Sequence, residues 1–162
     1  MIRLLSYTLL ISLLAFASAG CALGPVMITP SSNPLASFEQ YKQVFATEEY
    51  DQLYNLLDQE SKVNSLKFVA SIDSELLKKL SKVGYVAERK GLNNAQQLGA
   101  FVRALMKIQP GERKRIMNLK ALRNPFRTKT RCRIRAKASH LSKPIAFNYI
   151  LEEGVWKLRS KW

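Results

Sequence analysis

The most restrictive feature of the sequence is an unbroken two-residue alternation near its C-terminus. Residues 127–138 read RTKTRCRIRAKA, with a cation at every odd position and a small or apolar residue at every even one. Two further segments, beyond the turn sequences SHLS and EEG, repeat this period. A period of two places alternate side chains on opposite faces of a strand. We therefore expect an antiparallel meander of three strands, at residues 128–138, 143–151 and 155–161.

The apolar pattern also predicts how these strands pair, because a slip of one residue would turn every side chain to the other face. A two-residue turn at Glu153-Gly154 aligns Leu151 with Trp156, Tyr149 with Leu158, and Phe147 with Ser160. One face of the sheet is then apolar, and the outer face carries cations with no acid among them. The first strand would extend this cationic row about 33 Å, from Arg127 to Lys137. The candidate anion-binding residues are Arg131, Arg133, Arg135, Lys137, Lys157, Arg159 and Lys161.

The segment before the meander has the apolar spacing of helices. Stripes at steps of three and four predict helices over 37–57, with a break near Ala46, over 74–81 and over 94–108. Two capping boxes are expected, Ser37 with Gln40 and Asn94 with Gln97. Residues 113–123 fit a helix and a strand, and we favour the strand. Helices followed by a meander predict an α+β fold, with N-terminal helices packed on a curved antiparallel sheet of three to four strands.

Two quoted segments carry a family resemblance that covers residues 36–162. The ending FNYILEEGVWKLRSKW and the paired helices SFEQYKQVFATEEYDQLYNLL resemble the NTF2-like (cystatin-like) superfamily, in particular its small bacterial envelope lipoproteins. The resemblance implies a curved sheet around a long helix, with a cone-shaped cavity between them. Another helix-on-sheet α+β fold is the alternative. The residues expected to line such a cone are Phe101, Phe147, Tyr149 and Trp156.

The N-terminus resembles an export signal. MIRLLSYTLLISLLAFASAGC has one cation, then an uncharged and largely apolar run, and ends in small residues. Ser18-Ala19-Gly20-Cys21 resembles a lipobox, although Ser18 stands where Leu is usual, and it predicts lipidation of Cys21. An ordinary signal-peptidase site after Ala19 is the alternative, and it would leave Cys21 free to pair with Cys132. An uncleaved anchor is a third interpretation.

These features divide the chain into a signal peptide at 1–20, a tether at 21–35 and one domain at 36–162. The tether sequence is rich in Pro and Ser and has no charge, as expected of a linker. We therefore expect an exported protein of the bacterial cell envelope, anchored to the membrane by lipid and facing the periplasm or the exterior. No oligomeric state is predicted.

The charges are segregated along the chain. Residues 35–60 hold six acids and one lysine, whereas residues 61–162 hold twenty-four cations and six acids, within a net charge of +14. Such segregation favours an anionic partner. In the envelope the candidates are lipid headgroups, an envelope polymer or an acidic protein. Nucleic acid is disfavoured by the export signal and because no base-stacking aromatic residues alternate with the cations.

Residues suited to catalysis are few. His140 is the sole histidine and falls in a predicted turn, and Asp51, Tyr41 and Tyr54 are the other acid–base candidates that could reach the cone. No cluster has metal-ligand spacing and no Gly-rich phosphate loop is present, so we expect neither a metal nor another cofactor. We expect a binding or scaffolding domain. The alternative is an apolar-ligand carrier or isomerase-like enzyme that uses the cone.

Overall fold

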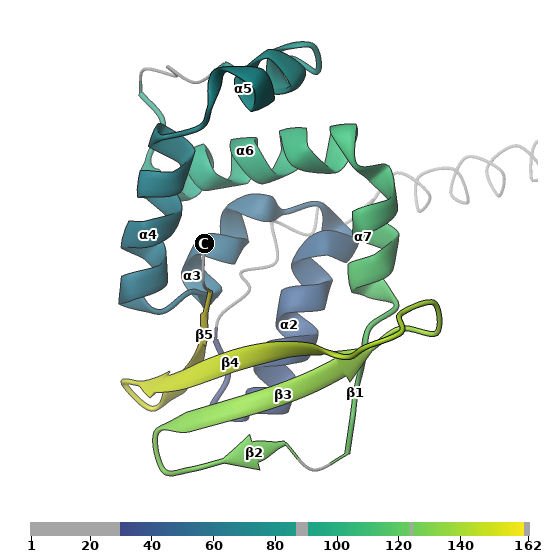
Figure 1. Ribbon diagram of the computed structural model, residues 1–162. Coiled ribbons are helices and arrows are strands. Elements are labelled where there is room, and N and C mark those ends of the chain that lie inside the picture. Colours follow the sequence, from purple (N-terminus) through teal and green to yellow (C-terminus); the bar gives the residue numbers. More distant parts are fainter. Residues whose placement is uncertain (1–29, 87–90, 124, 161–162) are drawn as a thin grey trace, which may run out of the picture.

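The computed structural model describes residues 30–86, 91–123 and 125–160, and it confirms the expected α+β class. Helices precede the strands along the chain (Figure 1). The helical elements are α2 (Pro34–Thr47), the 3₁₀ turn η1 (Tyr50–Gln52), α3 (Leu53–Leu56), α4 (Gln59–Ala70), α5 (Ser74–Ser81), α6 (Asn94–Ile108) and α7 (Pro110–Met117). The strands are β1 (Lys120–Ala121), β2 (Phe126–Arg127), β3 (Arg131–Lys137), β4 (Ile145–Glu152) and β5 (Val155–Arg159).

Helix α2 begins before the predicted capping residue. Its N-cap is Asn33, whose side chain accepts a hydrogen bond from the Leu35 amide at 2.9 Å. Pro34 follows in the first turn, where a missing N–H costs nothing. Ser37 is buried inside the helix, and its hydroxyl accepts a hydrogen bond from the Ser31 amide at 3.1 Å. The predicted Ser37–Gln40 capping box is therefore wrong, because the Asn-Pro pair upstream already supplies the cap.

Helix α6 has a true capping box, one residue before the predicted one. Asn93 Oδ1 accepts a hydrogen bond from the Gln96 amide at 2.9 Å, and Gln96 Oε1 accepts one from the Asn93 amide at 3.0 Å. The prediction of Asn94 with Gln97 chose the wrong register. Because two Asn residues precede two Gln residues at the same spacing, the local pattern does not decide between them.

The strand expected over residues 113–123 is wrong for most of that segment. Helix α7 occupies it as far as Met117, and only Lys120–Ala121 forms a strand. Pro110 in the first turn of α7 suits a helix start. None of the residues of α7 is buried, and its large apolar side chains are Ile116 and Met117 at its end, so the helical pattern in this segment is weak.

The sheet has the predicted meander and register. Strand β3 pairs with β4, and β4 with β5, all antiparallel, so that Leu151 lies opposite Trp156 and Tyr149 opposite Leu158. The short strands β1 and β2 both pair with β3 on its other edge, which brings the sheet to five strands. Side chains of β3 alternate strictly between exposed and buried.

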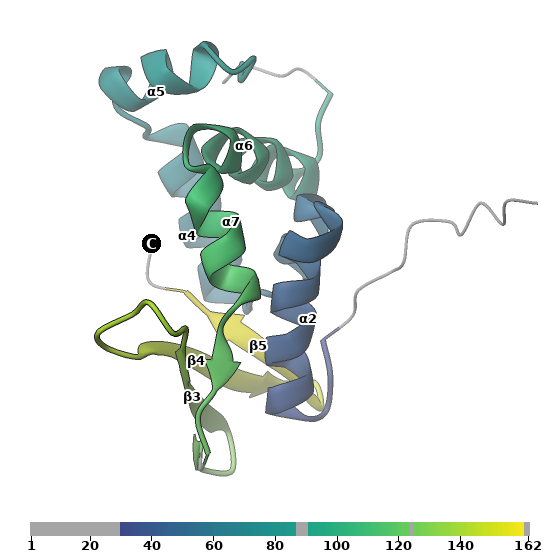
Figure 2. The ribbon, with the colours of Figure 1, turned by 90° about the vertical axis from the view of Figure 1, so that its right-hand side faces the viewer.

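The helices cover one face of the sheet and leave the other open. In both views α5 and α6 lie above the sheet, with α5 farthest from it, and α2 extends down alongside the strands (Figures 1 and 2). Phe38 of α2 packs edge to face on Phe147, with ring centroids 5.1 Å apart. Trp156, Tyr149 and Ile134 bring the inner face of the sheet into the same core. Within the described residues no helix is long and apolar enough to span a membrane.

Candidate anion-binding site

The outer face of β3 carries a row of cations. Arg131, Arg133, Arg135 and Lys137 are all exposed, and the residues between them are buried, as the alternation predicts. Successive cations in this row are about 6.6 Å apart along the strand, because they stand at every second residue. In the described part of the chain, no acidic side chain forms an ion pair with any of the four.

The row is shorter than the sequence suggested. Residues 128–130 form a turn in which Thr128 and Arg131 are hydrogen bonded, so the chain reverses and Arg127 belongs to β2. The Arg127 guanidinium carbon lies 5.2 Å from the centroid of the Trp156 ring, a cation–π contact. A row of four residues from Arg131 to Lys137 spans about 20 Å. Lys120 of β1 lies opposite Lys137 and adds a cation that the sequence did not place there.

Across the sheet, the three arginines of β3 lie opposite uncharged residues of β4. Arg131 is paired with Ile150, Arg133 with Asn148, and Arg135 with Ala146. Arg133 Nε donates a hydrogen bond to Asn148 Oδ1 at 3.0 Å, which orients the guanidinium. One guanidinium has five N–H donors, so most of its donors remain for a ligand.

Phe126 is a candidate site residue that sequence reasoning missed. It pairs with Arg133 in the β2–β3 ladder, so its ring lies on the cationic face, and it is 69% exposed. The ring borders a shallow hollow of about 450 Å³ on this face. The turn that folds β2 back contains no Gly or Asn, so the sequence gave no turn signal that would have revealed this pairing. The outer-face residues around the hollow are Phe126, Arg131, Arg133, Asn148, Ile150 and Arg159.

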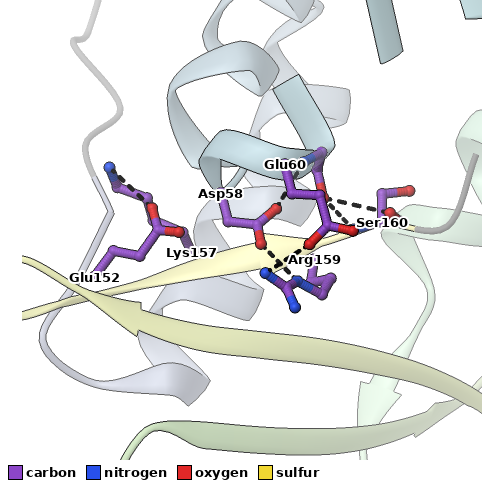
Figure 3. Close-up of polar contacts among 7 residues, drawn as sticks. Asp58, Glu60, Glu152, Lys157, Arg159 and Ser160 are labelled. Carbon is purple, nitrogen blue, oxygen red and sulfur yellow. Dashed lines mark hydrogen bonds and ion pairs between the residues drawn. The ribbon is translucent and has the colours of Figure 1, made fainter. Parts of the chain in front are cut away.

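The cations of β5 differ from those of β3, because acids neutralise them. Arg159 Nε donates a hydrogen bond to Asp58 Oδ2 at 2.6 Å, and Arg159 also lies 3.0 Å from a carboxylate oxygen of Glu60 (Figure 3). Lys157 Nζ lies 3.7 Å from Glu152 Oε2. The expectation of an outer face without acids is therefore wrong along β5. Lys161 lies outside the described residues.

The acids reach β5 because the start of α4 packs against the end of that strand. The Asp58 amide donates a hydrogen bond to the Leu158 carbonyl at 3.0 Å. Asp58 caps α4 by accepting a hydrogen bond from the Ser61 amide at 2.9 Å, and its side chain is fully buried. Burial alone would raise the pKa of this carboxyl, but the hydrogen bonds from Ser61 and Arg159 outweigh it and lower the pKa below its usual value. Arg159 is thus part of the structural connection between α4 and β5.

A second hollow lies between the helices and the sheet, as the expected cone would, and also measures about 450 Å³. Of the four aromatic residues predicted to line it, Phe147 does so, whereas Phe101, Tyr149 and Trp156 are buried in the core. The wall is shared by the helices α2, α3, α6 and α7 and by strands β4 and β5, with Phe147 as its aromatic residue from the sheet. The lining side chains are mostly apolar: Tyr41, Phe45, Leu53, Leu57, Val102, Leu105, Met106, Ile116, Phe147 and Leu158, with Ala146, Asn148, Arg159 and Ser160 completing the wall.

The acid–base candidates do not converge on either hollow. His140 is exposed in the β3–β4 turn. Asp51 Oδ1 is buried without a hydrogen-bond partner, 3.8 Å from an Arg103 nitrogen, and Tyr54 lies beneath the Lys62 ammonium. Tyr41 does line the inner hollow, and burial raises the pKa of its hydroxyl. Among the residues described, no three His, Cys, Asp or Glu side chains gather where a metal ion could bind.

The two cysteines have separate environments. Cys132 is a free, buried thiol on the inner face of β3, and burial raises its pKa. Cys21, the predicted lipidation site, falls outside the part of the chain that the structure covers.

Comparison with protein-family models, with curated proteins and with solved structures finds no match to this chain.

Proposed function

We propose that this chain is a non-catalytic binding module of the bacterial cell envelope, exported by residues 1–20 and anchored through lipidated Cys21. Its ligand-binding surface is the cationic row of β3, Arg131 to Lys137. The single observation that carries the proposal is that these four exposed cations have no acidic partner among the described residues, whereas Arg159 and Lys157 on the same sheet do.

An unneutralised row of this kind stabilises a bound anion more than it stabilises the fold. The cations are about 6.6 Å apart, which is within the screening length of about 8 Å at physiological salt. Like charges on adjacent strands, such as Lys120 opposite Lys137, are also unfavourable. A ligand with several negative charges removes this repulsion and gains charge-assisted hydrogen bonds from the guanidinium groups.

The test is binding of inorganic polyphosphate, a probe with repeated anionic groups and no apolar part. Arg133→Glu combined with Arg135→Glu should weaken binding at least tenfold at physiological salt, because two exposed, unpaired cations become anions. Lys67→Glu combined with Lys78→Glu is the matched control, since both lysines are exposed on helices and form no ion pair within the described chain. Equal loss of binding in the two double variants would mean that only net charge matters, and would contradict the proposal.

A second candidate function is favoured by the inner hollow. Its volume of about 450 Å³ and its mostly apolar wall suit a small apolar ligand. A general base for neutral pH needs a pKa near 7, and burial raises the pKa of Tyr41, the lining phenol, away from that range. The hollow is therefore better suited to a carrier than to an isomerase.

A further inference from the structure

The chain enters the domain at the same end of the sheet as the exposed Phe126. The Trp156 amide donates a hydrogen bond to the Ser31 carbonyl at 2.8 Å, and Trp156 lies opposite Leu151. The Leu151 amide in turn donates to the Thr130 carbonyl at 3.0 Å. The backbones at Ser31, Trp156, Leu151 and Thr130 thus lie side by side, about 4.8 Å apart, so that Ser31 is at most about 14 Å from Thr130.

The first arginine of the row comes directly after Thr130, and Phe126 lies opposite the second. The N-terminal segment therefore emerges close to Arg131, Arg133 and Phe126, rather than at the Lys137 end. Nine residues lie between Cys21 and Ser31, and the ten Cα–Cα steps of an extended chain reach at most about 35 Å. A lipid on Cys21 would hold this end of the sheet within that distance of a bilayer.

We propose that the anionic partner is the phospholipid surface to which the chain is anchored, bound by the end of the sheet that carries Arg131, Arg133 and Phe126. This inference rests on the proposed function and names its ligand class. Arginines contact headgroup phosphates, often by two parallel hydrogen bonds, while aromatic side chains occupy the boundary between headgroups and acyl chains.

Phe126 decides between a membrane and a soluble polyanion. A polyanion such as polyphosphate or a teichoic-type polymer offers nothing for a 69% exposed apolar ring. Single-stranded nucleic acid binds to several aromatic residues that stack successive bases. Within the described residues Phe126 is the one exposed aromatic ring beside the arginines, and the other exposed large apolar side chain there is Leu122, whose amide donates a hydrogen bond to the Arg135 carbonyl. A bilayer interface suits one ring surrounded by cations.

The experiment measures co-sedimentation of residues 30–162 with vesicles of phosphatidylglycerol mixed with phosphatidylcholine, and with phosphatidylcholine alone. Every residue of the described core lies between Phe38 and Leu158, so this segment contains the whole core. The test variants are Phe126→Ala and the double variant Arg131→Glu/Arg133→Glu. The controls are Val86→Ala, an exposed apolar residue after α5, and Lys67→Glu/Lys78→Glu.

We expect binding only to vesicles that contain phosphatidylglycerol. Each cation near such a surface strengthens binding about fivefold. The affinity of the Arg131→Glu/Arg133→Glu variant for these vesicles should therefore fall at least about 25-fold. Phe126→Ala should lower the affinity for vesicles about fivefold or more and leave the affinity for polyphosphate unchanged. Both control variants should change the affinity for vesicles by less than about threefold.

The outcomes separate this inference from the proposed function. Arginine-dependent binding of polyphosphate without binding to anionic vesicles, or vesicle binding that ignores Phe126→Ala, would overturn the membrane inference alone. Loss of arginine dependence with both probes would overturn the proposed function as well. Binding of an acidic protein or a nucleic acid more tightly than vesicles, at the same salt, would identify a different partner and also overturn the membrane inference.

Discussion

Replacing Asp58 with Asn tests whether one buried ion pair fastens α4 to β5. Asp58 Oδ1 accepts a hydrogen bond from the Ser61 amide, and Oδ2 accepts one from Arg159 Nε. Asn retains one oxygen that can accept the hydrogen bond of the cap. In place of the second carboxylate oxygen it has an uncharged NH₂ group, which cannot accept a hydrogen bond from the guanidinium. A hydrogen bond to a charged group contributes about 1.5–3 kcal/mol, so the free energy of unfolding should fall by about 2–3 kcal/mol. Asp58→Ala also removes the cap, worth about 1 kcal/mol more.

The same carboxyl makes this contribution depend on pH. Burial raises its pKa, but the hydrogen bonds from Ser61 and Arg159 outweigh burial, and the net pKa in the folded state is below the usual value. A group with a lowered folded pKa stabilises the fold above its unfolded pKa, about 4 for Asp, and loses that contribution as the pH falls through the folded pKa. The difference between wild type and Asp58→Asn should therefore be largest at neutral pH and shrink below about pH 4.

Urea unfolding followed by circular dichroism at pH 7 and pH 3 measures both effects. Glu60→Gln is the matched control, because Glu60 contacts the same guanidinium at 3.0 Å but is 64% exposed. An exposed pair contributes less than about 1 kcal/mol. Equal free energies of unfolding for Asp58→Asn and Glu60→Gln at pH 7, or an Asp58→Asn difference that is unchanged at pH 3, would show that this ion pair does not fasten α4 to β5.

Two further predictions concern packing around α6. A Cβ added at Gly99 would lie 2.7 Å from the Asp51 backbone nitrogen, so Gly99→Ala should lower the free energy of unfolding by about 1–3 kcal/mol in a thermal melt. Gly111→Ala is the control, because a Cβ there meets no atom within 4 Å, and it should leave the free energy of unfolding unchanged or raise it. Leu105→Trp should fill the inner hollow and abolish uptake of a fluorescent apolar probe, if the wild type takes up that probe. Uptake by the folded variant equal to that of the wild type would remove the carrier function from consideration.

The strands were predictable from sequence because their burial follows a short-range rule. In β3 every odd residue is exposed and every even residue is buried, so the register and both faces could be deduced before the structure. Helix α4 had no such signal. Its buried residues are Ser61 and Ser65, whereas Val63 is exposed and Phe68, which packs on Phe101, is only partly covered, so apolar periodicity does not identify its inner face.

The parts of the candidate site that were missed depend on contacts between distant or reversed segments. Asp58 and Arg159 are separated by 101 residues, and nothing in either local sequence identifies the other as its partner. The Phe126 ring reaches the cationic face because residues 128–130 form a turn. That turn contains no Gly or Asn, so the local sequence did not predict it. The sequence placed the cations of β3 and β5 on the outer face, but it did not predict the acids that neutralise those of β5.

The distinction between the two sets of cations is the strongest argument that the β3 row has a function. Around β5 the fold positions a buried carboxylate and an exposed one against Arg159, so this chain does bring acids to sheet cations where they stabilise its structure. On β3, uncharged residues of β4 lie opposite Arg131, Arg133 and Arg135, and the turn places Phe126 beside them instead of an acid. A row that served only solubility would not need an exposed phenylalanine within it, since such a ring lowers solubility. The proposed phospholipid surface, anionic at its headgroups and apolar beneath them, would account for this combination.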